Sequence, residues 1–363
     1  MLTRLLAPLV ALAFVAPSGR AQSRPSPGVA GNYVIRGFTF GSGEKLDSLT
    51  IHYRTLGTPR RDASGVVRNA VLILHGTTGS GDQFLNPIFA NELYGKGQPL
   101  DTTMYFIVLP DGIGHGASSR PSTGLRAHFP HYDYADMIEA QHRLLVDHLG
   151  VAHLRLVMGT SMGGMHSWMW AERYPEFMDG VVPLASAPTQ IAGRNRMIRR
   201  MVIEDITSDP QWNHGDYTSP PPGLRAALQM LFIMTSAPLV QQRTAPTRDQ
   251  ADSAIDATLD AGMRRQDAND MLYAFDASRN YDPSTGLDRI TAPLLAINSA
   301  DDQVNPPELG IMERLVPRVK RGRYLLLPIS PITRGHGTHT VAAAWKTPFK
   351  AFLDSLPPLP TLH

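Results

Sequence analysis

The most constraining feature of this sequence is an apolar run that ends in a glycine-rich turn with a central serine, within residues 154–171. The run is suited to a buried strand, and the turn carries the pattern G-x-S-x-G from Gly159 to Gly163. Apolar residues at helical spacing then predict a helix with one buried face: Met165, Trp168, Met169 and Tyr174. A strand, a tight turn and a helix form the context in which this pattern makes a nucleophile elbow.

Ser161 is the central residue of that turn, and its surroundings suit a nucleophile. A sharp strand-to-helix turn strains its central residue and lifts the side chain clear of the sheet. Glycines are needed beside it because a Cβ at Gly159 or Gly163 would collide with the neighbouring chain. Free N–H groups at the start of the next helix favour a nearby negative charge, such as a tetrahedral oxyanion. We therefore predict Ser161 as a catalytic nucleophile.

The composition excludes several classes of protein. Hydrophobic residues make up 42% of the 363 residues, which is enough for a sizeable core and excludes a disordered chain. Cysteine is absent, which excludes disulfides and thiolate metal sites. The net charge of +2 comes from two arginines within residues 1–21. The remaining chain is therefore close to neutral, and we expect no nucleic-acid partner.

Residues 1–21 resemble a secretory signal peptide. Arg4 supplies the charged start, and the apolar run that follows is too short to span a bilayer. Small residues at the two cleavage-determining positions predict cleavage before Gln22. We therefore expect a periplasmic or secreted protein without stable membrane insertion after cleavage. A short N-terminal membrane anchor is the alternative interpretation.

Strand patterns alternate with helical patterns along much of the chain. Strands are predicted at residues 33–40, 49–56, 70–74, 104–109, 180–184, 290–297 and 324–327, in addition to the strand before the elbow. An amphipathic helix is predicted at residues 136–149. This alternation predicts the α/β class, with a mostly parallel central sheet flanked by helices.

The pattern changes at residues 188–276, which hold helical segments, a proline cluster and no strand signal. Because this insertion separates two core strands, we expect a helical cap over the carboxyl edge of the sheet, where open α/β sheets bind ligands. Residues 22–187 and 277–363 would then form the core. Four cap arginines either contact an acidic group of the substrate or form a solvated helix face: Arg194, Arg196, Arg199 and Arg200.

A second glycine-rich loop, at residues 75–79, follows a predicted buried strand. No Gly-Lys-Ser/Thr follows it, so a phosphate-binding P-loop is disfavoured. An N–H group from this loop and the N–H group of the residue after the nucleophile would form an oxyanion hole. We predict Thr77 and Met162 in these roles, and an ordinary surface loop is the alternative. The glycines at residues 110–116 do not fit a dinucleotide-binding pattern, and no cofactor is predicted.

Candidates for the catalytic acid and base follow the last two predicted strands. Asp302 is preferred to Asp301 as the acid because it begins the pattern D-x-V-x-P, although either could cap a helix instead. His336 is preferred to His339 as the base because the glycines beside it allow it to approach the serine. A His-x-x-His metal site is disfavoured because no matching acid follows, so no metal is predicted.

The chain order serine, aspartate, histidine is that of α/β hydrolases. Three segments narrow the resemblance further: YDYADMIEAQ at residues 132–141, GTSMGGMHSWMWAERYP at residues 159–175 and DPQWNHGDY at residues 209–217. With the Gly335-His336 loop, they resemble the homoserine O-acetyltransferase branch of the α/β hydrolases over nearly the whole mature chain. The resemblance implies Ser161 as nucleophile, Asp302 as acid and His336 as base. It also implies an acyl-serine intermediate and a homodimer formed through the helical lid.

Two hypotheses about function follow. The first is an exported serine hydrolase that cleaves small carboxylic esters or related acyl compounds. The second is an acyltransferase with the same triad, in which an alcohol such as homoserine replaces water. Predicted export favours the first because acetyl-CoA is a cytoplasmic donor, and residues 114–121 depart from the corresponding segment of the biosynthetic enzymes. A non-catalytic binding protein is disfavoured because every member of the triad is present.

Overall fold

An eight-stranded sheet runs through the computed structural model, which describes residues 27–359 and 361. The strand order is β1-β2-β4-β3-β5-β6-β7-β8. The strands are β1 (Val29–Thr39), β2 (Lys45–Leu56), β3 (Ala70–Leu74), β4 (Phe106–Pro110), β5 (Leu156–Thr160), β6 (Val181–Leu184), β7 (Leu294–Ser299) and β8 (Gly322–Leu327). Strands β1 and β2 pair antiparallel, β2 pairs antiparallel with β4, and the remaining pairs are parallel. The predicted signal peptide and its cleavage before Gln22 lie outside the described residues.

Every predicted strand corresponds to an observed strand, with shifts at the ends. Strands β1 and β2 begin four residues earlier than predicted, and β7, which was predicted from residue 290, begins four residues later, at Leu294. Pro293 stands just before it and has no N–H group to donate to a neighbouring strand. The predicted helix at residues 136–149 begins earlier, at Tyr134, because the Asp133 side chain accepts hydrogen bonds from the first turn of that helix.

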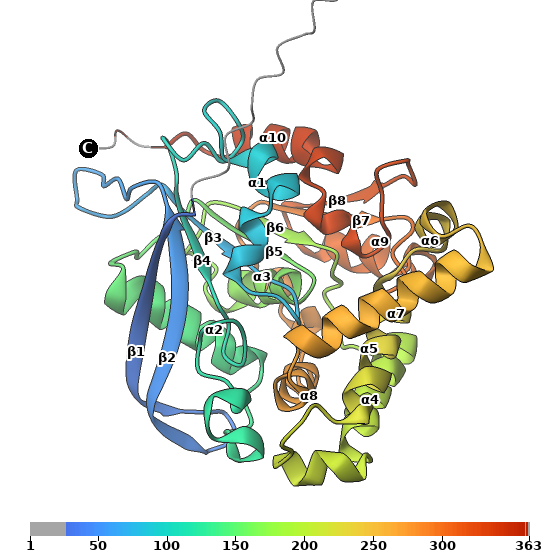
Figure 1. The fold of residues 1–363 in the computed structure, drawn as a ribbon. Coiled ribbons are helices and arrows are strands. Elements are labelled where there is room, and N and C mark those ends of the chain that lie inside the picture. Colours follow the sequence, from blue (N-terminus) through green and yellow to red (C-terminus); the bar gives the residue numbers. More distant parts are fainter. Residues whose placement is uncertain (1–26, 360, 362–363) are drawn as a thin grey trace, which may run out of the picture.

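Alternate residues of the buried strands pack against opposite layers of helices. In β3, Ala70, Leu72 and Leu74 belong to one hydrophobic cluster, and Val71 and Ile73 belong to the other. On the first face lie α2 (Tyr134–Arg143), α3 (Met162–Arg173) and α9 (Ile311–Leu315), and on the second lie α1 (Pro87–Leu93) and α10 (Lys346–Asp354) (Figure 1). The sheet is therefore buried on both faces, as the continuous apolar runs predicted.

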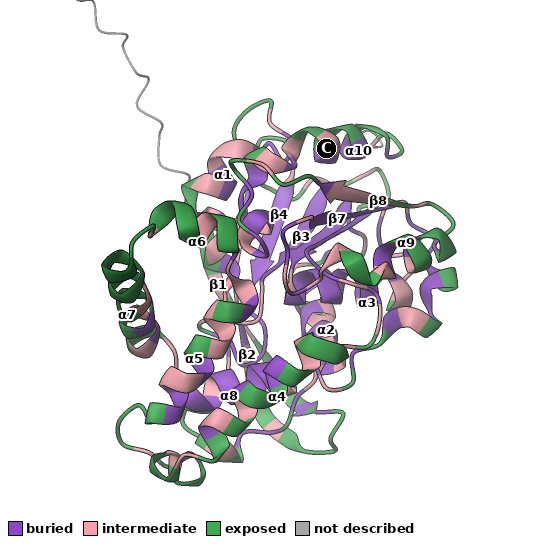
Figure 2. Ribbon diagram, turned by 90° about the vertical axis from the view of Figure 1, so that its right-hand side faces the viewer, coloured by how far each residue is buried: buried purple, intermediate pink, exposed green. Residues whose placement is uncertain are grey.

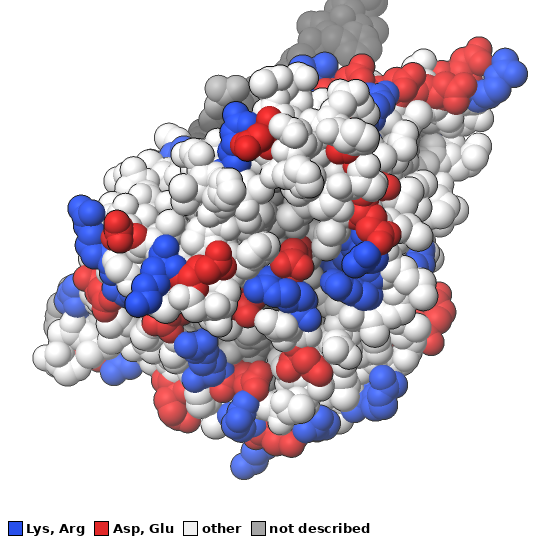
Figure 3. Space-filling view, turned by 90° about the horizontal axis from the view of Figure 1, so that it is seen from below, with Lys and Arg blue, Asp and Glu red and all other residues white. Residues whose placement is uncertain are grey.

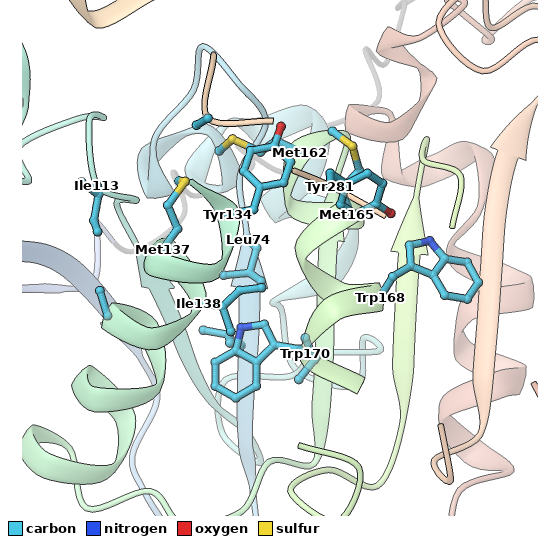
Figure 4. Packing of buried hydrophobic residues seen from close by; sticks show 14 of the residues in the cluster. Leu74, Ile113, Tyr134, Met137, Ile138, Met162, Met165, Trp168, Trp170 and Tyr281 are labelled. Carbon is cyan, nitrogen blue, oxygen red and sulfur yellow. The ribbon is translucent and has the colours of Figure 1, made fainter. Parts of the chain in front are cut away.

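Helix α3, which follows the elbow, is buried over most of its surface (Figure 4). Trp168 and Trp170 are both fully buried, so the prediction of one buried face was too narrow. Each indole N–H group has an acceptor: Trp168 Nε1 donates to Ser186 Oγ at 3.2 Å, and Trp170 Nε1 donates to Gln141 Oε1 at 2.9 Å. The serine at the head of this helix is therefore attached to a rigid part of the core.

Between β6 and β7 every element is helical. The α-helices are α4 (Gly193–Thr207), α5 (Pro222–Thr235), α6 (Pro238–Thr244), α7 (Arg248–Arg265) and α8 (Ala268–Asp276). They gather at one side of the sheet, and α6 and α7 are largely exposed (Figures 1 and 2). We call this group of helices the cap. The division of the chain at residues 188 and 276 stays a prediction.

Two surface properties bear on possible partners. Acidic and basic side chains intermix on the face shown in Figure 3, and neither sign forms a continuous patch there. No single helix among the described residues is long and apolar enough to cross a membrane. Helices α5 and α6 reach that length and composition only together, and the chain bends by 105° between them.

Candidate active site

The turn between β5 and α3 has the strained geometry that the sequence predicted for a nucleophile elbow. Ser161 has φ 56° and ψ −113°, a backbone conformation that residues other than glycine rarely adopt. Its N–H group donates to the Leu184 carbonyl oxygen at 2.9 Å, which holds the turn against β6. A Cβ on Gly159 would lie 2.2 Å from the Gly163 carbonyl oxygen, and one on Gly163 would lie 1.9 Å from the Leu74 carbonyl oxygen. The glycines are therefore required by close backbone approach.

The structure brings the three predicted triad residues together from three distant parts of the chain. His336 Nε2 lies 2.8 Å from Ser161 Oγ, and His336 Nδ1 lies 2.9 Å from Asp302 Oδ2. An ionised Asp302 only accepts hydrogen bonds, so Nδ1 donates to it and Nε2 is free to accept the serine proton. This arrangement can transfer the hydroxyl proton of Ser161 to His336 as the oxygen attacks an acyl carbon.

Asp302 is held in its ionised form by its neighbours. Burial alone would raise the pKa of this carboxyl, which is 1% exposed. The facing His336 and the hydrogen bonds from Val304 and Asn305 more than offset burial, and they hold the pKa of Asp302 below its ordinary value. The site can therefore offer a carboxylate to stabilise an imidazolium on His336.

The two alternative residues lie beside the triad rather than in it. Asp301 Oδ2 accepts the Gly335 N–H group at 2.9 Å, and its other oxygen accepts the Ser299 hydroxyl. It therefore fixes the loop that carries His336. The ring of His339 has no hydrogen bond to Ser161 or to Asp302 and packs edge-on against the His336 ring at 5.2 Å. This geometry favours Asp302 as the acid and His336 as the base.

The predicted oxyanion-hole residues lie on two sides of Ser161. Met162 is the first residue of α3, where backbone N–H groups have no partner within the helix. Thr77 lies in the loop after β3 and lines the same cavity as Ser161. The loop passes close to the nucleophile, since a Cβ on Gly76 would lie 3.5 Å from the Ser161 Cβ. Both residues are thus positioned for the predicted roles, which stay a prediction.

The cavity above Ser161 has a volume of about 400 Å³ and lies between the core and the cap. The core contributes Thr77, His336 and His339 to its wall, and the cap contributes Arg199 of α4 and Phe275 of α8. The structure therefore places a cap arginine in the same cavity as Ser161.

Arg199 is 3% exposed, and none of its bonded partners is a carboxylate. Its Nε donates to Asn195 Oδ1 at 2.9 Å, its Nη1 donates to Ser278 Oγ at 3.1 Å, and its guanidinium lies 5.4 Å from the centre of the Phe275 ring. A buried cation without an anionic partner is costly, so this site would be stabilised by an anionic group of a ligand.

The other three arginines of the predicted cluster do not line this cavity. Arg194 donates to Gln303 at the surface, Arg200 pairs with Glu204 one turn along α4, and Arg196 is only partly buried. The two interpretations of the cluster therefore apply to different members. Arg199 faces the cavity, and Arg194 and Arg200 belong to a solvated helix face.

Comparison with known proteins identifies the family. A model described as the alpha/beta hydrolase fold matches residues 69–324. Homoserine O-acetyltransferase from Haemophilus influenzae is 33% identical over 285 residues, which cover 71% of this chain and 77% of that protein. The chain belongs to the α/β-hydrolase family, in the branch that resembles homoserine O-acetyltransferase.

Two solved structures have the fold of this α/β hydrolase. Homoserine O-acetyltransferase from Bacillus anthracis matches with a TM-score of 0.78 at 21% identity, over 91% of this chain and 99% of that chain. Esterase E22 matches with a TM-score of 0.77 at 20% identity, over 90% of this chain and 99% of that chain. At these identities the likeness concerns the fold alone. The predicted fold class, with its inserted helical cap, is confirmed.

Two buried histidines that were not predicted as functional residues support the loop that carries Thr77 in this α/β hydrolase. His75 Nδ1 lies 2.8 Å from the Gly76 carbonyl oxygen, and its Nε2 accepts the Gly112 N–H group at 2.9 Å. His115 Nε2 lies 2.6 Å from the Thr77 carbonyl oxygen. Burial, with a smaller contribution from His115, lowers the pKa of His75 to about 4, so it is neutral at working pH. The only signal in the sequence was that each histidine follows a predicted strand.

Proposed function

We propose that this α/β hydrolase is an O-acyltransferase. Ser161 takes a short acyl group from an activated ester or thioester, and the acyl-serine passes it to the hydroxyl of a small alcohol that carries a carboxylate, as homoserine does. The observation that carries the proposal is Arg199, a buried arginine without a carboxylate partner in the cavity of Ser161 and His336. The name of the Haemophilus influenzae relative supports transfer over the hydrolysis that the sequence analysis preferred.

The chemistry follows from the distances. His336 Nε2 removes the proton of Ser161 as Oγ attacks the acyl carbon, and Asp302 stabilises the imidazolium. The N–H groups of Thr77 and Met162 stabilise the oxyanion until the leaving group departs with the proton. The acceptor hydroxyl then gives its proton to His336 and attacks the acyl-serine. The Arg199 guanidinium binds the acceptor carboxylate and so orients its hydroxyl.

Hydrolysis of small esters is the second candidate. A neighbouring hollow of about 650 Å³ shares Thr77, Thr78, Gly79 and Gln83 with the cavity of Ser161, so a second hollow adjoins the site of the proposed acyl-serine. Water would then replace the alcohol in the second step with no change in the triad. The export predicted from residues 1–21 would favour this outcome and stays a prediction.

Product analysis separates the two candidates. The protein is incubated with p-nitrophenyl acetate, with and without L-homoserine, and the acetylated product is identified by mass spectrometry. O-Acetylhomoserine as the main product supports transfer, and acetate alone at saturating L-homoserine rejects it. Ser161→Ala should lose about 10⁴-fold or more of the turnover in either case. Ser64→Ala, which removes an exposed hydroxyl remote from the cavity, is the matched control.

A further inference from the structure

His339 is a wall residue of the catalytic cavity that the proposed mechanism leaves unused. It lies in the 3₁₀ turn Gly337–Thr340, directly after His336. A 3₁₀ helix has three residues per turn, so side chains three positions apart lie above one another. The rings of His336 and His339 accordingly meet edge-on, with centres 5.2 Å apart, and both line the cavity.

The nitrogens of His339 have no partner among the described residues. Its Nδ1 is buried without a hydrogen bond, its Nε2 bonds to no described residue, and its backbone carbonyl accepts from Trp345 Nε1 at 3.2 Å. Both nitrogens of His75 and of His115 face a hydrogen-bonding group, whereas buried His166, which does not line the cavity, also leaves its Nε2 without a partner. Because Nδ1 has almost no accessible surface, Nε2 is the ring atom through which His339 can bind a ligand in the cavity.

The ring of His339 is neutral at working pH. Burial, together with the nearby His336, lowers the pKa of His339 to about 3. A neutral imidazole has one N–H donor and one lone pair, so it can bind a hydroxyl or a water molecule without competing with His336 for the proton. It is therefore suited to hold a nucleophile rather than to activate one.

We propose that His339 binds the hydroxyl of the acceptor and so positions it for deacylation. This inference rests on the acyl-serine of the proposed function. The acceptor hydroxyl must lie within hydrogen-bond reach of His336 Nε2, which places it beside the His339 ring. Its proton passes to His336 Nε2 and its oxygen bonds to the acyl carbon. The bond from that carbon to Ser161 Oγ then breaks, and His336 returns the proton to Oγ.

The test separates acylation from deacylation in the full-length protein. His339→Phe keeps an aromatic ring beside His336 and removes both nitrogens, whereas His339→Gln restores a donor and an acceptor. The burst of p-nitrophenol from p-nitrophenyl acetate reports acylation, and decay of the acetyl-enzyme with L-homoserine, followed by mass spectrometry, reports deacylation. His142→Phe, a half-buried histidine stacked on Tyr174 away from the cavity, is the matched control.

We expect His339→Phe to keep its burst rate within about twofold and to slow deacylation about tenfold, the effect of one ordinary hydrogen bond. His339→Gln should recover part of that loss, and His142→Phe should resemble the wild type. Unchanged deacylation in His339→Phe, or an equal loss of burst and deacylation, overturns the role of His339 alone. A wild-type protein that never acylates Ser161 overturns the proposed function as well.

Discussion

The elbow and the cap meet at one cavity but are built in opposite ways. Nine of the twelve residues of α3 are buried, and its glycines lie against backbone carbonyls. Only Leu259 and Gly262 are buried among the eighteen residues of α7, and that helix is largely exposed in Figure 2. The core therefore fixes the reacting atoms, and the cap can change without disturbing them. From this comparison we expect the core to provide the catalytic groups and the cap to determine which substrate binds.

The largest expected effect contrasts one glycine from each region. Gly163→Ala puts a methyl group 1.9 Å from the Leu74 carbonyl oxygen, and neither backbone can move easily. We expect it to reduce the free energy of unfolding by about 3 kcal/mol or more, or to prevent folding. Gly262→Ala meets only the end of the Leu228 side chain, at 2.9 Å, and gains helix propensity, so its change should stay within about 1 kcal/mol.

Urea unfolding of the two alanine variants beside the wild type checks this contrast. Equal midpoints for Gly163→Ala and Gly262→Ala would show that the elbow is no more constrained than the cap.

The second prediction separates the two neighbouring acids of the core. Asp302→Asn leaves His336 without the carboxylate that orients and stabilises it, so kcat should fall about 10⁴-fold. Asp301→Asn keeps an oxygen that can accept the Gly335 N–H group, so we expect a loss of about tenfold or less. Steady-state kinetics with p-nitrophenyl acetate measure both. The assignment of the acid is wrong if Asp301→Asn proves the more damaging substitution.

The core could be predicted from sequence because its constraints are local. An apolar run, two glycines and a central serine specify the elbow within a few residues, and the strained φ of Ser161 agrees. The support of the Thr77 loop by His75 and His115 could not be predicted, because it depends on contacts between loops after different strands. Only the short pattern D-x-V-x-P favoured Asp302 over Asp301 in the sequence. The distance to His336 was needed to decide which acid faces the base.

In the cap, helical spacing in the sequence could have distinguished Arg199 from the other three arginines, which were interpreted as one cluster. Arg199, Val202 and Ile206 are spaced by three and four residues, and all three lie on the buried face of α4. The helical spacing therefore places Arg199 on the buried face of α4, whereas Arg194 and Arg200 are exposed. That its face meets a cavity rather than solid core depends on the docking of the cap, which no local pattern encodes.

The third prediction tests whether the cap chooses the substrate. Arg199→Met removes the guanidinium that would bind the acceptor carboxylate, so KM for L-homoserine should rise about 30-fold or more. The burst with p-nitrophenyl acetate, which carries no carboxylate, should change by less than about twofold, since the triad is intact. Arg194→Met, on the exposed face of the same helix, is the control. A burst that falls as far as acceptor affinity would show that Arg199 supports the core instead.

The smallest expected effect concerns Asp270, which lies where the cap contacts the core. Asp270 of α8 accepts hydrogen bonds from the Ser122 N–H group at 2.8 Å and from the Ser122 hydroxyl at 2.6 Å. Burial raises the pKa of Asp270 to about 6, although the bonds from Ser122 oppose that rise. The folded protein therefore binds more protons at this site than the unfolded chain between the ordinary pKa of 3.8 and about 6. The free energy of unfolding should fall as pH rises through that window.

Asp270→Asn cannot ionise, so it should remove this site's contribution to the pH dependence of stability. Thermal unfolding of the wild type and of Asp270→Asn between pH 4 and pH 7 measures the difference. Asp260→Asn, at an exposed carboxylate of α7 that pairs with Arg225, controls for the loss of a negative charge from the cap. If the melting temperatures of the wild type and Asp270→Asn keep the same dependence on pH, Asp270 is as well solvated as a surface group. The contact between Asp270 and Ser122 would then be as accessible to water as the surface of the cap, and the rigid part of the protein would end within the core.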